Sequence, residues 1–136
     1  MLLTIEKVLI LKSVSIFSEI PEESLVSVAS VLELRELKPG EEVVKQGEIG
    51  TSMYIIANGK VSVRVGDREV ATLGEREIFG ELAALDSEPR SATVTALEDT
   101  TVFRLGQEAI YELMGEHTDL TRGIIAVLCR RLRGHQ

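Results

Sequence analysis

Apolar residues at helical spacing occupy the first 30 positions of the chain. Ile5, Val8 and Leu9, with Lys12, follow a helical period and place apolar side chains on one side. A second helix is expected to begin at Pro21, because proline suits the first helical turn, where its missing N–H is not needed. The stripe that this helix should bury consists of Leu25, Val28 and Ala29. We therefore expect N-terminal helices within residues 1–30.

From about residue 31 the apolar period changes from helical spacing to two, which is typical of strands. Short β-rich runs then recur at close and regular intervals. The expected strands are residues 31–37, 42–45, 53–57, 60–65, 69–73, 91–97 and 101–105. Many short strands at such spacing indicate a β-sandwich, roll or barrel. The pattern thus predicts one β-rich body over residues 31–105.

Two dipeptides between these runs are typical turn signals. Asn58-Gly59 is the stronger, because both residues tolerate the positive φ of a type I′ hairpin turn. Gly66-Asp67 has a similar role one hairpin later. The sequence predicts tight hairpins at both places.

Helical spacing returns near Gln107 and continues toward the end of the chain. Thr118 can cap a last helix, in which an apolar residue recurs at every fourth position. This apolar seam consists of Leu120, Ile124, Leu128 and Leu132. The arginines of the same helix either complement its dipole or contact a ligand or partner. We expect two C-terminal helices over residues 107–133, and the seam is a candidate surface for a homodimer.

Composition and charge exclude several classes of function. The 136 residues are 44% hydrophobic and 27% charged, which is typical of one soluble globular domain. A net charge of −7 argues against binding to nucleic acid, and no apolar run approaches the roughly 20 residues that a membrane span needs. Cys129 is the single cysteine, so it can form neither an internal disulfide nor a thiolate metal site alone. We expect a cytoplasmic protein with no membrane insertion and no metal site.

Candidate chemistry is concentrated in residues 79–94, FGELAALDSEPRSATV. Gly80 permits a tight turn, and the helix formers after it would offer free N–H groups to an anion. Arg90, just after Pro89, can hold phosphate oxygens and stays charged when partly buried. Glu81 can accept hydrogen bonds from sugar hydroxyls. These residue types describe a nucleotide site without a catalytic group, although an ordinary surface ion pair between Glu81 and Arg90 explains the same spacing.

Two motifs of the chain resemble the cyclic-nucleotide-binding domain family. Residues 79–94 are similar to its phosphate-binding cassette, whose pattern is matched by Phe79, Gly80, Glu81, Pro89, Arg90, Ser91, Ala92 and Val94. Residues 43–59 are similar to the family's other signature, in which two apolar residues precede Gly-Glu-x-Gly and an apolar strand that ends in glycine. We interpret this second stretch as structural rather than ligand-binding, with Gly47 and Gly50 in turns of positive φ.

The resemblance implies a fold that is mainly β with flanking α. It is a double-stranded β-helix, a jelly-roll-like β-roll, with N-terminal helices and two C-terminal helices in a single domain over residues 1–136. The implied ligand is cAMP or cGMP, and no cofactor is implied. Arg90 would pair with the cyclic phosphate and Glu81 would accept the ribose 2′-hydroxyl.

The implied site extends over the cassette and one further helix. Its ligand-binding residues are Gly80, Glu81, Leu82, Ala83, Arg90, Ser91 and Ala92. Neither tyrosine lies where an aromatic lid over the base is expected, so the candidates for the lid are Leu128, Arg131 and Leu132 of the last helix. No Ser–His–Asp, Cys–His or paired-carboxylate arrangement is suggested, so we expect no enzyme and no catalytic residue.

The function implied by the resemblance is that of the sensor or regulatory domain of a signalling protein. The chain would then be part of a larger one, with the output domain outside these residues. In the family, the residue after the arginine is often Ala in cAMP-selective members and Thr in many that favour cGMP. Ser91 is small like Ala but carries a hydroxyl like Thr, so it leaves the choice open. We expect cAMP to be favoured over cGMP, mostly from its frequency as a ligand in the family. The alternative is a degenerate fold that serves only as a protein–protein interaction module.

Overall fold

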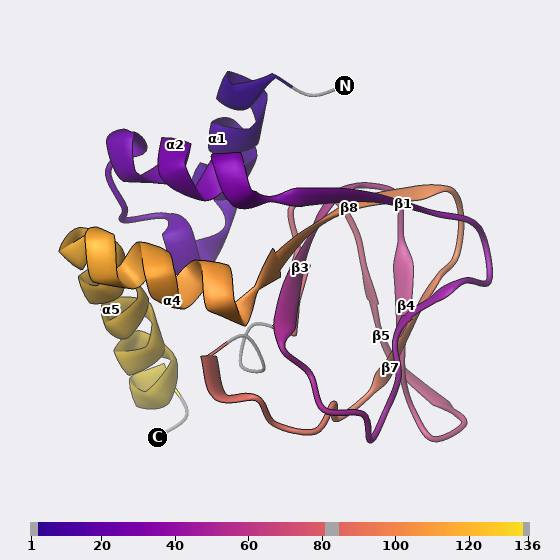
Figure 1. The fold of residues 1–136 in the computed structure, drawn as a ribbon. Coiled ribbons are helices and arrows are strands. Elements are labelled where there is room, and N and C mark those ends of the chain that lie inside the picture. The colour runs from indigo at the N-terminus through magenta and orange to yellow at the C-terminus, as the bar shows by residue number, and fades with distance from the viewer. Residues whose placement is uncertain (1–2, 81–84, 135–136) are drawn as a thin grey trace. The chain divides into compact units, whose positions relative to one another are not determined.

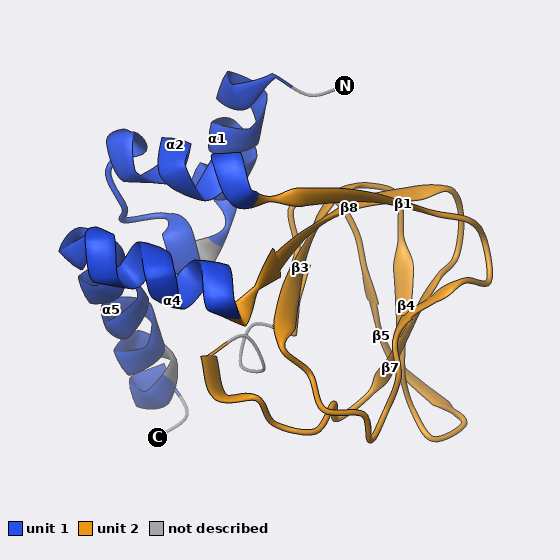
Figure 2. Cartoon of the chain, viewed as in Figure 1, with its two compact units in different colours: residues 1–31, 108–136 blue, residues 32–107 orange. Residues whose placement is uncertain are grey.

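The computed structural model describes residues 3–80 and 85–134, and the chain divides into two compact units. Residues 32–107 form a β-rich unit, and residues 1–31 and 108–136 form a helical unit (Figure 2). The first contains the segments whose apolar residues alternate with period two. The second contains most of the segments with helical spacing.

The described residues of the β-rich unit form two four-stranded antiparallel sheets (Figure 1). The first has the order β1 (Glu33–Leu37), β8 (Thr100–Gly106), β3 (Ser52–Asn58) and β6 (Ile78–Phe79). The second has the order β2 (Glu42–Val44), β7 (Thr93–Ala96), β4 (Val61–Val65) and β5 (Arg68–Leu73). The expected strands agree with these to within two residues at either end, and the predicted mainly β fold is confirmed. Val31, placed at the start of the first strand, instead ends a helix, and β6 was not predicted because two residues show no period.

Side chains from both sheets alternate inward to form the core of the β-rich unit. The first sheet contributes Leu37, Tyr54, Ile56, Phe79 and Val102, and the second contributes Val61, Val94 and Ala96. Met53 and Ile55, which alternate with Tyr54 and Ile56 along β3, are also fully buried. The strand is therefore buried on both faces, as its continuous apolar run predicts.

The chain passes from one sheet to the other at Asn58-Gly59, where a hairpin was predicted. β3 pairs with β8 and β6, whereas β4 pairs with β5 and β7, so that prediction is wrong. Of the two residues only Gly59 has a positive φ, of 99°, and Asn58 pairs with Thr101. A Cβ on Gly59 would lie 2.7 Å from the Thr100 Cα. The dipeptide marks a close approach of two strands, because a turn signal reports local backbone and not pairing partners.

The second predicted hairpin, at Gly66-Asp67, is confirmed. β4 and β5 pair up to Val65 and Arg68, so these two residues alone connect the strands. Gly66 has a φ of 61°, which is the left-handed conformation that such turns require at glycine.

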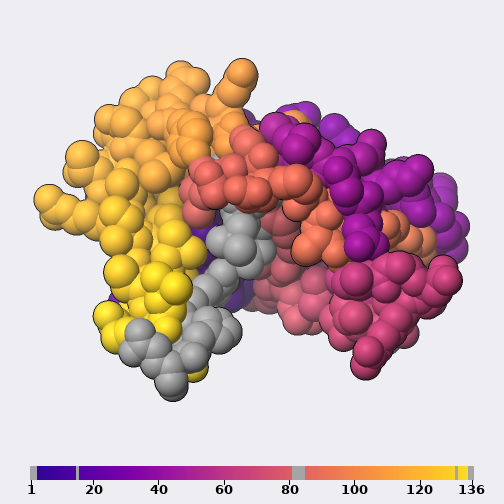
Figure 3. All heavy atoms as spheres, turned by 90° about the horizontal axis from the view of Figure 1, so that it is seen from below, coloured from indigo at the N-terminus to yellow at the C-terminus, as the bar shows by residue number. Residues whose placement is uncertain are grey.

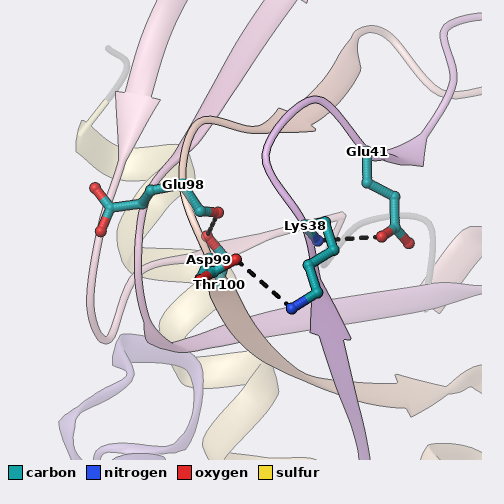
Figure 4. Close-up of polar contacts among 5 residues, drawn as sticks. All are labelled: Lys38, Glu41, Glu98, Asp99 and Thr100. Carbon is teal, nitrogen blue, oxygen red and sulfur yellow. Dashed lines mark hydrogen bonds and ion pairs between the residues drawn. The ribbon is translucent and has the colours of Figure 1, made fainter.

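Hydrogen bonds fix the turns beside the crossing between the sheets (Figure 4). The backbone N–H of Lys38 donates to Glu41 Oε1 at 3.1 Å. The buried Thr100 hydroxyl donates to the Glu98 carbonyl at 2.9 Å and accepts from the Lys60 N–H at 3.2 Å. These bonds leave the buried hydroxyl satisfied on both sides, as its position requires.

The helices before and after the sheets are α1 (Thr4–Ser13), η1 (Ser15–Phe17), α2 (Glu22–Val31), α4 (Gln107–Glu116) and α5 (Thr118–Gly134). Their core includes Leu11, Phe17, Ile20, Leu25, Val28, Ala29, Leu120 and Ile124. The predicted stripe of α2 is confirmed, but α1 buries Val8 and Leu11 and leaves the predicted Ile5 and Leu9 exposed. None of the helices in the described ranges has the length and apolar content that a membrane span requires.

The apolar seam predicted on α5 is only partly buried. Leu120 and Ile124 are inaccessible, whereas Leu132 is 67% exposed. Val127, which is not part of the seam, is buried, while its neighbour Leu128 is only partly buried. A helix has 3.6 residues per turn, so each step of four residues rotates the seam by about 40°. A seam formed by every fourth residue therefore turns from the buried side of the helix toward solvent before the helix ends.

We expect Gly59→Ala to lower the free energy of unfolding by about 1–3 kcal/mol, because alanine is strained at this φ and its Cβ meets the Thr100 backbone. Gly74→Ala is the matched control, since the φ of Gly74 is not left-handed and the nearest atom to an added Cβ is 3.9 Å away. Urea unfolding followed by circular dichroism measures both variants. Equal midpoints would contradict the role of Gly59.

Candidate ligand-binding site

The cassette segment begins at the end of β6 and continues to β7. Gly80 follows β6 directly and has a φ of 77°, as the predicted tight turn requires. Glu81, Leu82 and Ala83, three of the predicted site residues, lie outside the described residues. Leu85 and Asp86 are helical, and the segment from residue 85 lies at the surface in the view of Figure 3.

The backbone of Arg90 is held by the stretch that contains the second motif. The Arg90 N–H donates to the Glu48 carbonyl at 2.7 Å, and the Gly47 N–H donates to the Arg90 carbonyl at 2.9 Å. An isolated bridge between Ile49 and Pro89 continues this pairing. The motif interpreted as structural therefore positions the residue with the candidate chemistry.

The Arg90 side chain is surrounded by backbone. Its Nη2 donates to the Ser52 carbonyl at 2.8 Å. A Cβ on Gly80 would collide with Nη1, and a Cβ on Gly50 would collide with Nε and Cζ. The prediction that Gly50 has a positive φ is wrong, because its φ lies outside the left-handed region. Gly50 is needed for the close approach of a side chain, a contact that the motif alone does not reveal.

The guanidinium of Arg90 is partly removed from water. Burial lowers its pKa below the ordinary value for arginine, with smaller effects from Tyr54, which raises it, and Arg104, which lowers it. Nη1 is buried and has no hydrogen-bond partner among the described residues. A buried donor without an acceptor is costly, so this position favours an anion. Within residues 3–80 and 85–134, no group of three or more His, Cys, Asp or Glu side chains could hold a metal ion.

Four of the predicted site residues line one pocket of about 120 Å³. They are Gly80, Arg90, Ser91 and Ala92. The other lining residues are apolar and come from both sheets: Val44, Val63, Phe79 and Val94. Sequence reasoning did not assign this apolar wall to the site, although period-two spacing on β2, β4 and β7 was available as a signal. A cation beside an apolar wall suits a ligand with an anionic part and an apolar part.

The proposed lid residues Leu128, Arg131 and Leu132 all belong to α5, in the helical unit. Leu128 is partly buried and Leu132 is exposed. Arg130 of the same helix forms an ion pair with Glu19 at 2.6 Å, with both side chains about half exposed. This pair accounts for one of the basic residues of α5, and the lid stays a prediction.

The chain matches the model of one protein family over more than half of its length. The model of the cyclic nucleotide-binding domain matches residues 34–117, which extend from β1 to the end of α4 and include both motifs. The chain belongs to the cyclic nucleotide-binding domain family. Arg90 and Gly80 lie within the matched range of this family's domain.

Relatives of this cyclic nucleotide-binding domain include signalling proteins of different kinds. The cGMP-dependent protein kinase of Toxoplasma gondii is 38% identical over 105 residues, which are 77% of this chain and 11% of the kinase. The cyclic AMP receptor protein of Thermus thermophilus is 32% identical over 128 residues, which are 90% of this chain and 59% of that protein. The chain thus spans about a tenth of the kinase's length.

The solved structures agree on the fold. The N-terminal domain of a transcriptional regulator from Streptomyces coelicolor matches with a TM-score of 0.87. The match covers 93% of this chain and 94% of that chain at 24% identity, which shows a shared fold.

Proposed function

We propose that this domain binds a cyclic nucleotide, cAMP in preference to cGMP, as the sensor of a larger cytoplasmic signalling protein. The observation that carries the proposal is the buried Nη1 of Arg90, which lacks a hydrogen-bond partner among the described residues. The oxygens of a cyclic phosphate accept hydrogen bonds and carry the charge that this donor needs. Their arrival would satisfy both the hydrogen bond and the charge.

We assign the other contacts with the ligand to the residues that line the pocket beside Arg90 and to the cassette residues after Gly80. Ser91 and Ala92 would complete the phosphate contacts beside Arg90, and the apolar wall with Val63 and Val94 offers a surface to the rest of the ligand. Gly80 would let the chain turn close to the phosphate. We further assign the ribose 2′-hydroxyl to Glu81 and additional amide contacts to Leu82 and Ala83.

The alternative function, a protein–protein interaction module without a ligand, explains the site less well. A surface used only for contacts has no need of a desolvated guanidinium that two glycines accommodate. We propose that the domain itself catalyses nothing and does not bind nucleic acid, in keeping with its net charge of −7. Signal output would come from a segment other than these residues.

We also propose that the domain can form a homodimer through α5. Ile125 and Leu132 of this helix are 53% and 67% exposed, and exposed apolar side chains on one helix favour association. Leu120 and Ile124, which the predicted seam included, are buried within the chain and are not available for this contact.

Arg90→Ala should weaken cAMP binding by about one to two orders of magnitude, because a charge-assisted hydrogen bond contributes roughly 1.5–3 kcal/mol. Isothermal titration calorimetry measures the change. Arg68→Ala, which removes an exposed arginine of β5, is the control and should bind as the unchanged chain does. Equal affinities for the unchanged chain and Arg90→Ala would refute the site.

Glu81→Ala should weaken cAMP strongly and 2′-deoxy-cAMP much less, because the deoxy ligand already lacks the hydroxyl that Glu81 is proposed to bind. A double-mutant cycle over the two proteins and two ligands isolates this contact. Equal losses for the two ligands would exclude the ribose role.

In competition between the two nucleotides, cAMP should displace a bound fluorescent analogue at a lower concentration than cGMP. Ser91→Ala should widen the difference, because it removes the hydroxyl that resembles the threonine of many cGMP-selective members. A lower midpoint for cGMP on the unchanged chain would reverse the proposed preference.

A further inference from the structure

Gly47 and Gly50, the glycines of the Gly-Glu-x-Gly part of the second motif, are needed for different physical reasons. Gly47 has a φ of 91°, and a Cβ added to it would have no atom within 4 Å. Gly50 has an ordinary φ, yet an added Cβ would lie 2.8 Å from the Arg90 Cδ and closer still to Nε and Cζ. The first glycine thus serves the turn, whereas the second leaves room for a guanidinium.

One terminal nitrogen of this guanidinium is bound to a carbonyl of the sheet. Its Nη2 donates to the carbonyl of Ser52, a buried residue of β3 that pairs with Gly106 in the sheet. Nη1 lies against Gly80 at the start of the cassette. Because Nη2 is already hydrogen-bonded to the Ser52 carbonyl of β3, Nη1 is the terminal nitrogen that can bind a ligand.

We propose that Gly50 is a positioning residue for Arg90. Its missing side chain lets the guanidinium lie against the Ser52 carbonyl, and this contact directs Nη1 toward the phosphate. The claim about the phosphate rests on the proposed function, whereas the claim about the arginine orientation does not. A side chain at residue 50 would displace the flexible Arg90 side chain rather than the sheet.

The test compares Gly50→Ala with Gly74→Ala, two substitutions at glycines whose φ alanine can adopt. Gly74→Ala should fold at least as well as the unchanged chain, because it removes glycine's freedom from the unfolded chain without a collision. Gly50→Ala brings the same gain but adds the collision with the Arg90 side chain. Gly50→Ala should weaken cAMP binding by about tenfold or more in calorimetry, and Gly74→Ala should leave it unchanged. Equal affinity for the two variants overturns the proposal.

A double variant separates positioning from a general structural role. If Gly50 acts through Arg90, adding Gly50→Ala to Arg90→Ala should cause no further loss of affinity. If Gly50→Ala alone folds poorly, its unfolding midpoint should recover in the double variant, because the colliding side chain is gone. Additive losses of affinity, or a low midpoint that persists, overturn the proposal.

A measurement without ligand distinguishes failure of this proposal from failure of the proposed function. The Nε–Hε resonance of Arg90, assigned by its loss in Arg90→Ala, should shift in Gly50→Ala and remain in place in Gly74→Ala. If the unchanged chain binds no cyclic nucleotide, the proposed function is wrong, but this shift still supports the positioning role. An unchanged resonance in Gly50→Ala overturns the positioning role whatever the chain binds.

Discussion

The site depends on the backbone pairing of residues 47–50 with residues 88–90. This pairing holds Arg90 by two hydrogen bonds: its N–H donates to the Glu48 carbonyl, and its carbonyl accepts from the Gly47 N–H. Because these bonds involve only backbone groups, they place the Cα of Arg90 without help from a ligand. The Ser52 carbonyl then sets the direction of its side chain, so the guanidinium is oriented by the backbone of the protein itself.

Burial of this cation carries a cost. Burial lowers the pKa of Arg90, and its Nη1 has no acceptor among the described residues. An anion at Nη1 would satisfy this donor, so in the proposed complex the cost of burying it would be offset. This exception to the rule that buried donors are satisfied lies at Arg90, the residue proposed to contact the phosphate, and functional sites are where such exceptions are expected.

Local patterns and pairing patterns were not equally accessible from the sequence. Alternation of apolar residues placed the strands well, because it reports the burial of each side chain in turn. It did not reveal their partners: Asn58-Gly59 predicts a hairpin, although β3 and β4 lie in different sheets. Spacing on α5 likewise did not show which members of the apolar seam are covered, because it does not report how far a helix face stays covered.

The sequence by itself determined the types of the elements, the family and the charged residue of the candidate site, because these follow from local period and from two motifs. The tertiary structure alone decided that the second motif supports Arg90, that Nη2 is occupied by Ser52 and that Gly50 makes space for the guanidinium. The physical reason is that these contacts depend on the register between segments far apart in the chain. No local pattern of residues encodes that register.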